Sequence, residues 1–259
     1  MRMKAIILAG GLGTRLSEET HSKPKPMVEI GGMPILWHIM KIYSSYGIKD
    51  FIICLGYKGY YIKEYFNNYP LHNADISFDL KNKEYKVSND NTEDWNVTCI
   101  DTGKDTQTGG RLKRLEGLFE NDETFLFTYG DGLGDINIKK SIESHEQSGK
   151  IATVTAVNPP GRFGAIEMND QNEVINFQEK PAKGDTWING GFFVLNTQIF
   201  KYITGDDMPW EDIPLKTITS EKQLNCYKHE GFWQPMDTLR EKGILNDLYA
   251  EDQAPWKIW

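Results

Sequence analysis

Residues 8–16 read Leu8-Ala9-Gly10-Gly11-Leu12-Gly13-Thr14-Arg15-Leu16 and directly follow the apolar run at residues 3–7. An apolar run that ends in glycines predicts a buried strand with a ligand-binding loop at its carboxyl end. Glycines let backbone N–H groups approach a polyphosphate without a Cβ clash, and concave groups of N–H favour anions. Arg15 adds a planar, permanently charged fork that suits phosphate. We therefore predict a triphosphate-binding loop.

Two common phosphate loops do not fit these glycines. A dinucleotide fingerprint requires G-x-G-x-x-G, but Leu16 stands where the third glycine should follow Gly11 and Gly13. A P-loop requires a lysine directly after its glycines, and none follows here. Instead, Lys25-Pro26 comes ten residues after Arg15. With the glycine turn, the arginine and Lys-Pro in this order, the chain resembles the sugar-nucleotide pyrophosphorylases, nucleotidylyltransferases that act on sugar 1-phosphates.

The composition is that of an ordinary globular protein, with 259 residues, 39% of them hydrophobic and 25% charged. The net charge of −8 argues against a nucleic-acid partner, because basic patches supply affinity for nucleic acids. No apolar run approaches the ~20 residues that span a bilayer, so we expect no membrane partner. The first strand begins within four residues, which leaves no room for a signal peptide, and we expect a cytoplasmic protein.

Strand-like and helix-like patterns alternate through the first 150 residues, which predicts an α/β fold with a mostly parallel, Rossmann-like sheet and helices on both faces. The expected strands there are 4–9, 50–55, 96–101 and 124–129, and the expected helices are 34–46, 58–68, 110–119 and 137–148. Later come strands at 151–157, 163–168, 173–178 and 188–195 and helices at 210–221 and 238–250. We expect one domain, 1–259, with a nucleotide-binding part at 1–150 and a strand-rich, sugar-binding and closing part at 151–259.

Residues 72–95 break this alternation, because they are polar, charged and loosely alternating. Such a pattern indicates an exposed hairpin inserted into the order of the sheet. It could be a mobile loop, a lid or a contact between subunits. The family resemblance implies a homo-oligomer, with hexamers among its bacterial members, and makes this segment a candidate contact.

Two aspartates are candidate metal ligands. Asp131 follows an apolar strand and lies between two glycines, and Asp237 precedes the helix expected at 238–250. Isolated aspartates of this kind are often turn or N-cap residues. Carboxylate oxygens nevertheless suit Mg²⁺, which usually takes one or two of them together with phosphate oxygens. The family resemblance implies that Asp131 and Asp237 together hold Mg²⁺.

The same resemblance assigns the sugar phosphate to the second half of the chain. It implies that Glu179 binds sugar hydroxyls, that Lys180 binds the sugar phosphate and that Gly164 lines the sugar pocket. Asn189 and Gly190 belong to a strand whose paired glycines have no side chains to pack, and interior glycines weaken a strand unless something approaches closely. A hexose ring bonded to Asn189 would account for that gap.

A second glycine-bearing turn, residues 101–111, joins a strand to a helix. Its polar groups could read a base edge, and Arg111 could meet phosphate near the start of the helix. Capping of that helix explains Thr108 equally well. The resemblance places nucleotide recognition around Thr106 and Arg111. The full set of expected nucleotide-binding residues is Leu8, Ala9, Gly10, Gly11, Leu12, Gly13, Thr14, Arg15, Lys25, Thr106, Arg111 and Gly130.

We expect a single in-line displacement with Arg15 and Lys25 as its catalytic cations. The attacking sugar phosphate is already an anion at neutral pH, so catalysis consists of positioning and charge neutralisation. Segments such as 29–38, 95–98, 159–164 and 231–237 resemble the cytidylyl-transferring members of the family, which implies CTP and glucose 1-phosphate as substrates and CDP-glucose for dideoxysugar and O-antigen synthesis. Composition and spacing fit UTP or dTTP equally well.

Two other classes of protein remain as alternatives. A catalytically silent nucleotide-sugar sensor would predict the loss of Lys25, Asp131 or Asp237, and all three are present. A dinucleotide binder would need the third glycine that the loop lacks. The sequence therefore favours the enzyme.

Overall fold

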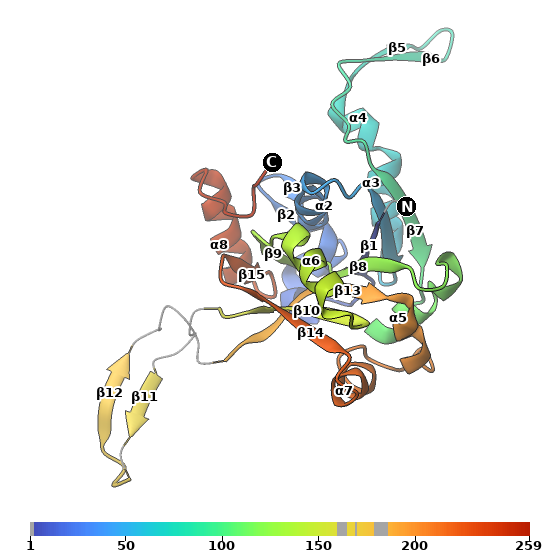
Figure 1. Ribbon diagram of the computed structural model, residues 1–259. Coiled ribbons are helices and arrows are strands. Elements are labelled where there is room, and N and C mark those ends of the chain that lie inside the picture. Colours follow the sequence, from blue (N-terminus) through green and yellow to red (C-terminus); the bar gives the residue numbers. More distant parts are fainter. Residues whose placement is uncertain (1–2, 160–164, 169, 179–185) are drawn as a thin grey trace.

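Seven strands form the central sheet of the computed structural model, which describes residues 3–159, 165–168, 170–178 and 186–259 (Figure 1). In sheet order they are β14 (Leu224–His229), β10 (Ala152–Val157), β13 (Ile188–Asn196), β8 (Thr124–Tyr129), β1 (Lys4–Ala9), β4 (Asp50–Leu55) and β7 (Asn96–Asp101). Of these seven, β13 alone runs antiparallel to its neighbours, β10 and β8. The other pairs are parallel, which confirms the mostly parallel sheet.

Helices cover both faces of this sheet, and β1 shows why. Ile7 belongs to one buried cluster, while its neighbours Ile6 and Leu8 belong to another, because successive strand side chains point to opposite faces. The helices that contribute to the Ile7 cluster are α2 (Ile35–Ser45), α3 (Gly59–Asn67), α6 (Ile138–Ser148) and α8 (Leu239–Ala250). Those that contribute to the other are α5 (Thr108–Lys113), η4 (Thr197–Tyr202) and α7 (Ile213–Ser220). Figure 1 shows the two groups on opposite sides of the sheet.

Several short elements were not expected. The predicted helix 110–119 is instead α5 followed by a 3-10 turn, η3 (Glu116–Leu118), and β14 was missed because its side chains are mostly polar and partly exposed. Two three-residue strands, β9 (Gly132–Gly134) and β15 (Trp233–Pro235), pair antiparallel outside the main sheet. The remaining unexpected elements are η1 (Thr14–Leu16), α1 (Ser17–Thr20), η2 (Lys25–Met27), β2 (Glu29–Ile30), β3 (Met33–Pro34) and α4 (Tyr69–Asn73). The strands expected at 163–168 and 173–178 are present as β11 (Ala165–Met168) and β12 (Val174–Gln178).

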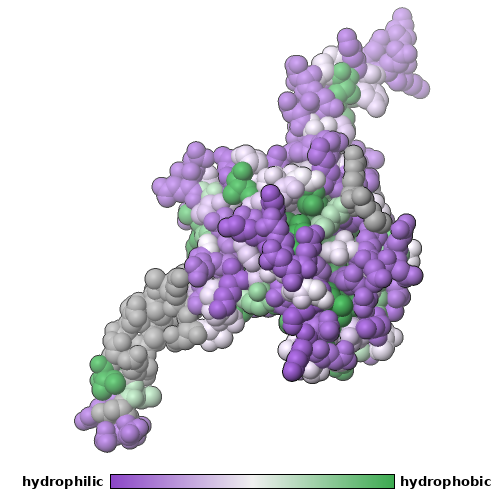
Figure 2. All heavy atoms as spheres, viewed as in Figure 1, coloured by the Kyte–Doolittle hydropathy of each residue, from purple (hydrophilic) through white to green (hydrophobic). Residues whose placement is uncertain are grey.

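The polar segment 72–95 forms the expected hairpin, but outside the central sheet. Strands β5 (Asp75–Asp79) and β6 (Glu84–Ser88) pair antiparallel. They form an arm that projects from the body of the molecule (Figures 1 and 2). Phe78 and Tyr85 pair across it and are largely exposed. In the part of the chain that the structure describes, no helix has the length and apolar character needed to cross a bilayer.

Candidate active site

A cleft of about 390 Å³ opens at the carboxyl ends of β1 and β8. The glycine loop forms one wall, and the start of α5 forms another. Ligands of parallel sheets bind at this edge, as the sequence predicted for the loop. The lining consists of Leu8, Ala9, Gly10, Gly11, Gly13, Thr14, Arg15, Lys25, Pro26, Thr106, Gln107, Thr108, Arg111, Tyr129, Gly130, Asp131 and Glu211. Most of the expected nucleotide-binding residues are therefore brought together, whereas Leu12 lies outside the lining and is half exposed.

Two glycines allow the backbone to adopt this shape. Gly13 has φ +64°, a left-handed conformation that side chains with a Cβ rarely adopt. Gly130 lies so close to β1 that a Cβ there would be 2.3 Å from the carbonyl oxygen of Leu8. Neither position accepts another residue without a shift of the loop or of the strand end.

Arg111 has a role that the sequence did not predict. Its side chain is buried, and its Nη1 donates to Leu55 O, Thr102 Oγ1 and Gly103 O at 2.7–3.0 Å. Its Nη2 donates to Gly10 O at 3.1 Å and also to Lys104 O. The guanidinium thus braces the first glycine of the loop against the ends of neighbouring strands. Its expected contact with phosphate remains a prediction.

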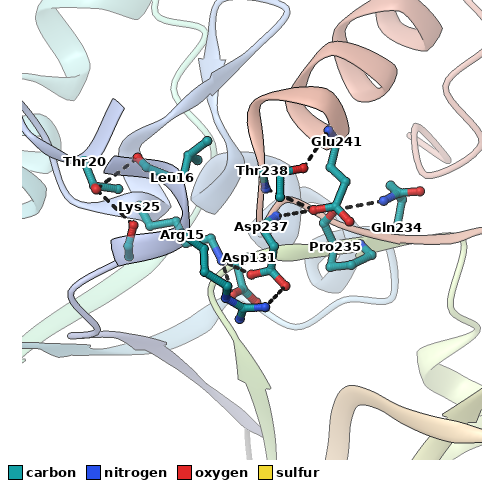
Figure 3. A network of polar contacts seen from close by, with 11 residues as sticks. Arg15, Leu16, Thr20, Lys25, Asp131, Gln234, Pro235, Asp237, Thr238 and Glu241 are labelled. Atoms are coloured by element: carbon teal, nitrogen blue, oxygen red, sulfur yellow. Dashed lines mark hydrogen bonds and ion pairs between the residues drawn. The ribbon is translucent and has the colours of Figure 1, made fainter. Parts of the chain in front are cut away.

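Four charged side chains meet beside the cleft (Figure 3). Lys25 Nζ lies 2.7 Å from Asp131 Oδ2 and 2.6 Å from Asp237 Oδ1. Arg15 Nη1 lies 2.7 Å from the other oxygen of Asp237. The two predicted cations and the two predicted metal ligands are therefore in direct contact.

Local structure fixes both aspartates. The β9–β15 ladder brings their segments together, and Met236 N donates to Asp131 O at 2.8 Å. Glu241 then accepts hydrogen bonds from the backbone N–H groups of Asp237 (2.8 Å) and Thr238 (3.0 Å). Thr238 and Glu241 form a capping box at the start of α8. Asp237 is consequently held just outside a helix N-terminus whose own cap is already supplied.

Lys25 is the charge that balances this group. Burial alone would lower its pKa, but attraction and hydrogen bonds from Asp131 and Asp237 outweigh burial and raise the pKa above its usual value. Lys25 therefore stays protonated throughout the neutral range. Its ammonium occupies the point toward which both carboxylates are directed.

The carboxylates of Asp131 and Asp237 fit a magnesium ion whose remaining ligands would come from the bound nucleotide and from water. Within the described residues, no cluster of three or more His, Cys, Asp or Glu could hold a metal. Two carboxylates beside a cleft with a glycine loop match Mg²⁺, which usually keeps water and phosphate oxygens in its remaining positions. The convergence of Asp131 and Asp237 on a single cation is the observation that supports this fit.

The cleft lining also contains residues that the sequence did not single out. Tyr129 donates to Glu211 Oε1 at 2.5 Å, and Thr108 donates to Glu211 Oε2 at 2.6 Å. Burial, the charge of Glu211 and the hydrogen bond to it raise the pKa of Tyr129, so its phenol keeps the proton. Tyr129 could have been found from its place at the end of a strand, just before Gly130-Asp131. Glu211 lies in a loop with no motif, so only the fold reveals it.

The sugar side is described in part. Asn189 donates to the hydroxyl of Tyr129 at 3.3 Å, which connects it to the wall of the cleft. A Cβ at Gly190 would be 2.7 Å from Val157 Cγ1, so packing against β10 already requires this glycine. A hexose is not needed to explain it, and its contact with sugar stays a prediction. Gly164, Glu179 and Lys180 lie outside the described residues.

Comparisons with known proteins show which family the chain belongs to. The family model for nucleotidyl transferases matches residues 4–238. Glucose-1-phosphate cytidylyltransferases of Salmonella typhimurium and Salmonella typhi are each 57% identical over 257 residues, covering 99% of this chain and 100% of theirs. A solved UDP-glucose pyrophosphorylase complexed with UDP-glucose has the same fold, with a TM-score of 0.69, 18% identity and coverage of 97% of this chain and 100% of that one. The chain belongs to the nucleotidyl transferase family.

Proposed function

We propose that this protein transfers the cytidylyl group of CTP to glucose 1-phosphate and releases pyrophosphate, giving CDP-glucose. The observation that carries the proposal is the contact of Lys25 and Arg15 with Asp131 and Asp237 beside the glycine-loop cleft. The high identity to two glucose-1-phosphate cytidylyltransferases supplies the base and the sugar. Transfer of a uridylyl or thymidylyl group to the same sugar phosphate is the alternative.

The reaction is one displacement at the α-phosphorus of CTP. A phosphate oxygen of glucose 1-phosphate forms a bond to that phosphorus, while the bond to the bridging oxygen of pyrophosphate breaks. The attacking phosphate is already an anion, so no base has to remove a proton. The loop amides at 10–14 and Arg15 hold the departing phosphates, and Lys25 neutralises charge on the α-phosphate.

Mg²⁺ is the proposed cofactor, held by Asp131 and Asp237. When bound, it would neutralise phosphate charge and orient the phosphate oxygens. Lys25 contacts both carboxylates in this structure and would then be free to turn toward the phosphate. Arg15 contacts Asp237, as Lys25 does. Arg15 could likewise leave Asp237 and bind a phosphate group of the nucleotide.

A homo-oligomer, up to a hexamer, is the proposed assembly. The β5–β6 arm supports it, because Phe78, Leu80 and Tyr85 expose large apolar side chains far from the body. A cytoplasmic site of action is also proposed, because all three cysteines, including the exposed Cys226, are free thiols. The product would supply dideoxysugar and O-antigen synthesis.

Pyrophosphate release tests the proposal. The assay uses glucose 1-phosphate and Mg²⁺ with CTP, UTP, dTTP, ATP or GTP offered separately, and repeats each with EDTA. Release with CTP far above the others, lost with EDTA, is the expected result. Release mainly with UTP or dTTP would keep the reaction and reject the cytidylyl assignment, and no release with any nucleotide would reject the function.

A further inference from the structure

Glu211 is a carboxylate in a cleft that otherwise suits anions. It precedes α7, is exposed, and lines the cleft together with the glycine loop. Among the described residues, no lysine, arginine or histidine forms an ion pair with it. An unpaired carboxylate repels a triphosphate and loses hydration when a ligand covers it. Its presence is understandable if the ligand brings a hydrogen-bond donor to it.

The hydroxyls on either side of Glu211 cannot supply a donor to a ligand. Thr108 Oγ1 accepts the backbone N–H of Trp210 at 2.8 Å and gives its own proton to Glu211. The hydroxyl of Tyr129 accepts the amide of Asn189 and also gives its proton to Glu211. Each hydroxyl has one proton, and both are directed at the carboxylate. The Thr108–Glu211–Tyr129 group therefore offers a ligand lone pairs and negative charge.

The position of this group fits the base rather than the phosphates. Arg15 and Lys25 pair with Asp131 and Asp237 and not with Glu211. Glu211 instead accepts a hydrogen bond from Thr108, the first residue of α5, which belongs to the glycine-bearing turn 101–111 whose polar groups could read a base edge. A cytosine has an exocyclic amino group with two N–H donors, whereas uracil and thymine carry a carbonyl oxygen at the same ring atom.

We propose that Glu211 is a specificity-determining residue that accepts a hydrogen bond from the amino group of cytosine and rejects the carbonyl of uracil or thymine. This inference rests on the proposed function. A site whose acceptor is left unpaired, or placed against another acceptor, discriminates strongly, by about 10⁴-fold in favourable cases. Because Glu211 is exposed, we expect a smaller but measurable preference.

The experiment compares Glu211→Gln with Glu221→Gln. Glu221 accepts a hydrogen bond from Tyr202 at 2.5 Å on the surface and is absent from the cleft lining, so it is a matched control. The glutamine at 211 removes the charge and can offer a donor. We expect kcat/KM for CTP to fall about 10- to 100-fold while kcat/KM for UTP is unchanged or rises, with no change in Glu221→Gln.

Equilibrium binding keeps this test separate from turnover. Calorimetry with CTP and with UTP, without sugar phosphate, should show the same change of preference in Glu211→Gln, and circular dichroism reports whether the variant folds. Equal losses for CTP and UTP, or a loss confined to the KM of glucose 1-phosphate, would overturn the inference and indicate contact with ribose or sugar. If the wild-type chain releases no pyrophosphate, the proposed function fails, whereas the binding preference still decides the role of Glu211.

Discussion

The ammonium group of Lys25 lies 2.6 Å from the carboxylate of Asp237, although 212 residues separate the two in the sequence. The contact joins η2, which follows the first strand and the glycine loop, to the turn that precedes the last helix. It therefore depends on the whole sheet between them. A change at either end should affect catalysis while leaving the fold intact.

We expect Asp237→Asn to lower kcat by about 10²- to 10³-fold. The amide keeps the shape of the side chain but removes half of the negative charge that faces Lys25 and the proposed Mg²⁺. Pyrophosphate release, measured across a range of Mg²⁺ concentrations, should also show weaker metal dependence. Asp252→Asn is the matched control, because Asp252 pairs with Lys257 at 3.0 Å on an exposed surface. Full activity in Asp237→Asn would contradict the assigned site.

Arg15 should separate activity from stability. Its side chain is 73% exposed, so Arg15→Ala should change the free energy of unfolding by less than about 0.5 kcal/mol. We expect kcat/KM for the nucleotide to fall about 10- to 100-fold, because the fork that would hold phosphate is gone. Arg15→Lys should recover part of this loss, since it keeps the charge but loses the planar geometry. Urea denaturation and steady-state kinetics are measured on the wild type, Arg15→Ala and Arg15→Lys. A clear loss of stability in Arg15→Ala would contradict this prediction and indicate a structural role for Arg15.

Arg111 should behave in the opposite way. Removal of its buried guanidinium takes the side-chain donor away from Gly103 O and Lys104 O. Gly10 O loses one of its two donors and keeps the backbone N–H of Tyr57. We expect Arg111→Ala to lower the free energy of unfolding by about 3–5 kcal/mol, measured by urea denaturation. Arg114→Ala is the control, because the exposed pair of Arg114 with Asp206 should contribute about 1 kcal/mol or less. If Arg111→Ala and Arg114→Ala lost similar amounts of unfolding free energy, the structural role assigned to Arg111 would be wrong.

His38 should make stability depend on pH. Burial lowers its pKa from 6.5 to about 4, partly offset by hydrogen bonds to backbone carbonyls, among them Ile30 O at 2.8 Å. The unfolded chain therefore binds a proton in this range that the folded chain excludes. The free energy of unfolding is therefore highest above pH 6.5, where His38 is neutral in both states. As the pH falls toward 4, His38 becomes protonated in the unfolded chain, and the free energy of unfolding falls by about 3 kcal/mol. His38→Gln should show a correspondingly smaller fall in unfolding free energy between pH 7 and 4, whereas the exposed His72→Gln should match the wild type.

The arm provides a test of assembly. Phe78→Asp together with Tyr85→Asp puts charge on its two paired aromatic side chains. If the arm forms the subunit contact, light scattering should report a smaller assembly for this double variant. The control is Leu118→Asp, which should keep the larger assembly. The melting temperatures of the two variants should be similar, because neither change touches the buried core. Leu118 is also exposed but lies on η3, away from the arm. An unchanged mass would remove the arm from the interface.

Much of this architecture could be predicted from local pattern. The long buried strands β1, β4 and β8 fall where their apolar runs indicate, because such runs have few other stable solutions. Short elements could not be predicted in this way. Strands β9 and β15 have three residues each, which is too few to show an alternation of apolar and polar side chains. Their pairing also joins chain segments about a hundred residues apart.

The candidate site likewise contains residues that the sequence predicted and residues that only the structure reveals. Arg15, Lys25, Asp131 and Asp237 stand in motifs, so the sequence pointed to them before their contacts were known. The burial of Arg111 depends on carbonyls from three separate segments, namely the end of β4, the glycine loop and the turn after β7, which no motif records. Glu211 reaches the cleft from a loop before α7, and only the packing of that loop against α5 reveals it.

The placement of Asp237 beyond β15 has a consequence for truncated forms of the protein. A fragment that stops before residue 237 would keep the glycine loop, Lys25 and Asp131 but would lack the second carboxylate. Such a fragment could not complete the group of charges around Lys25. Proteolysis after β15 would therefore separate the two halves of the charged group, even though both strands of the β9–β15 ladder remain in the fragment.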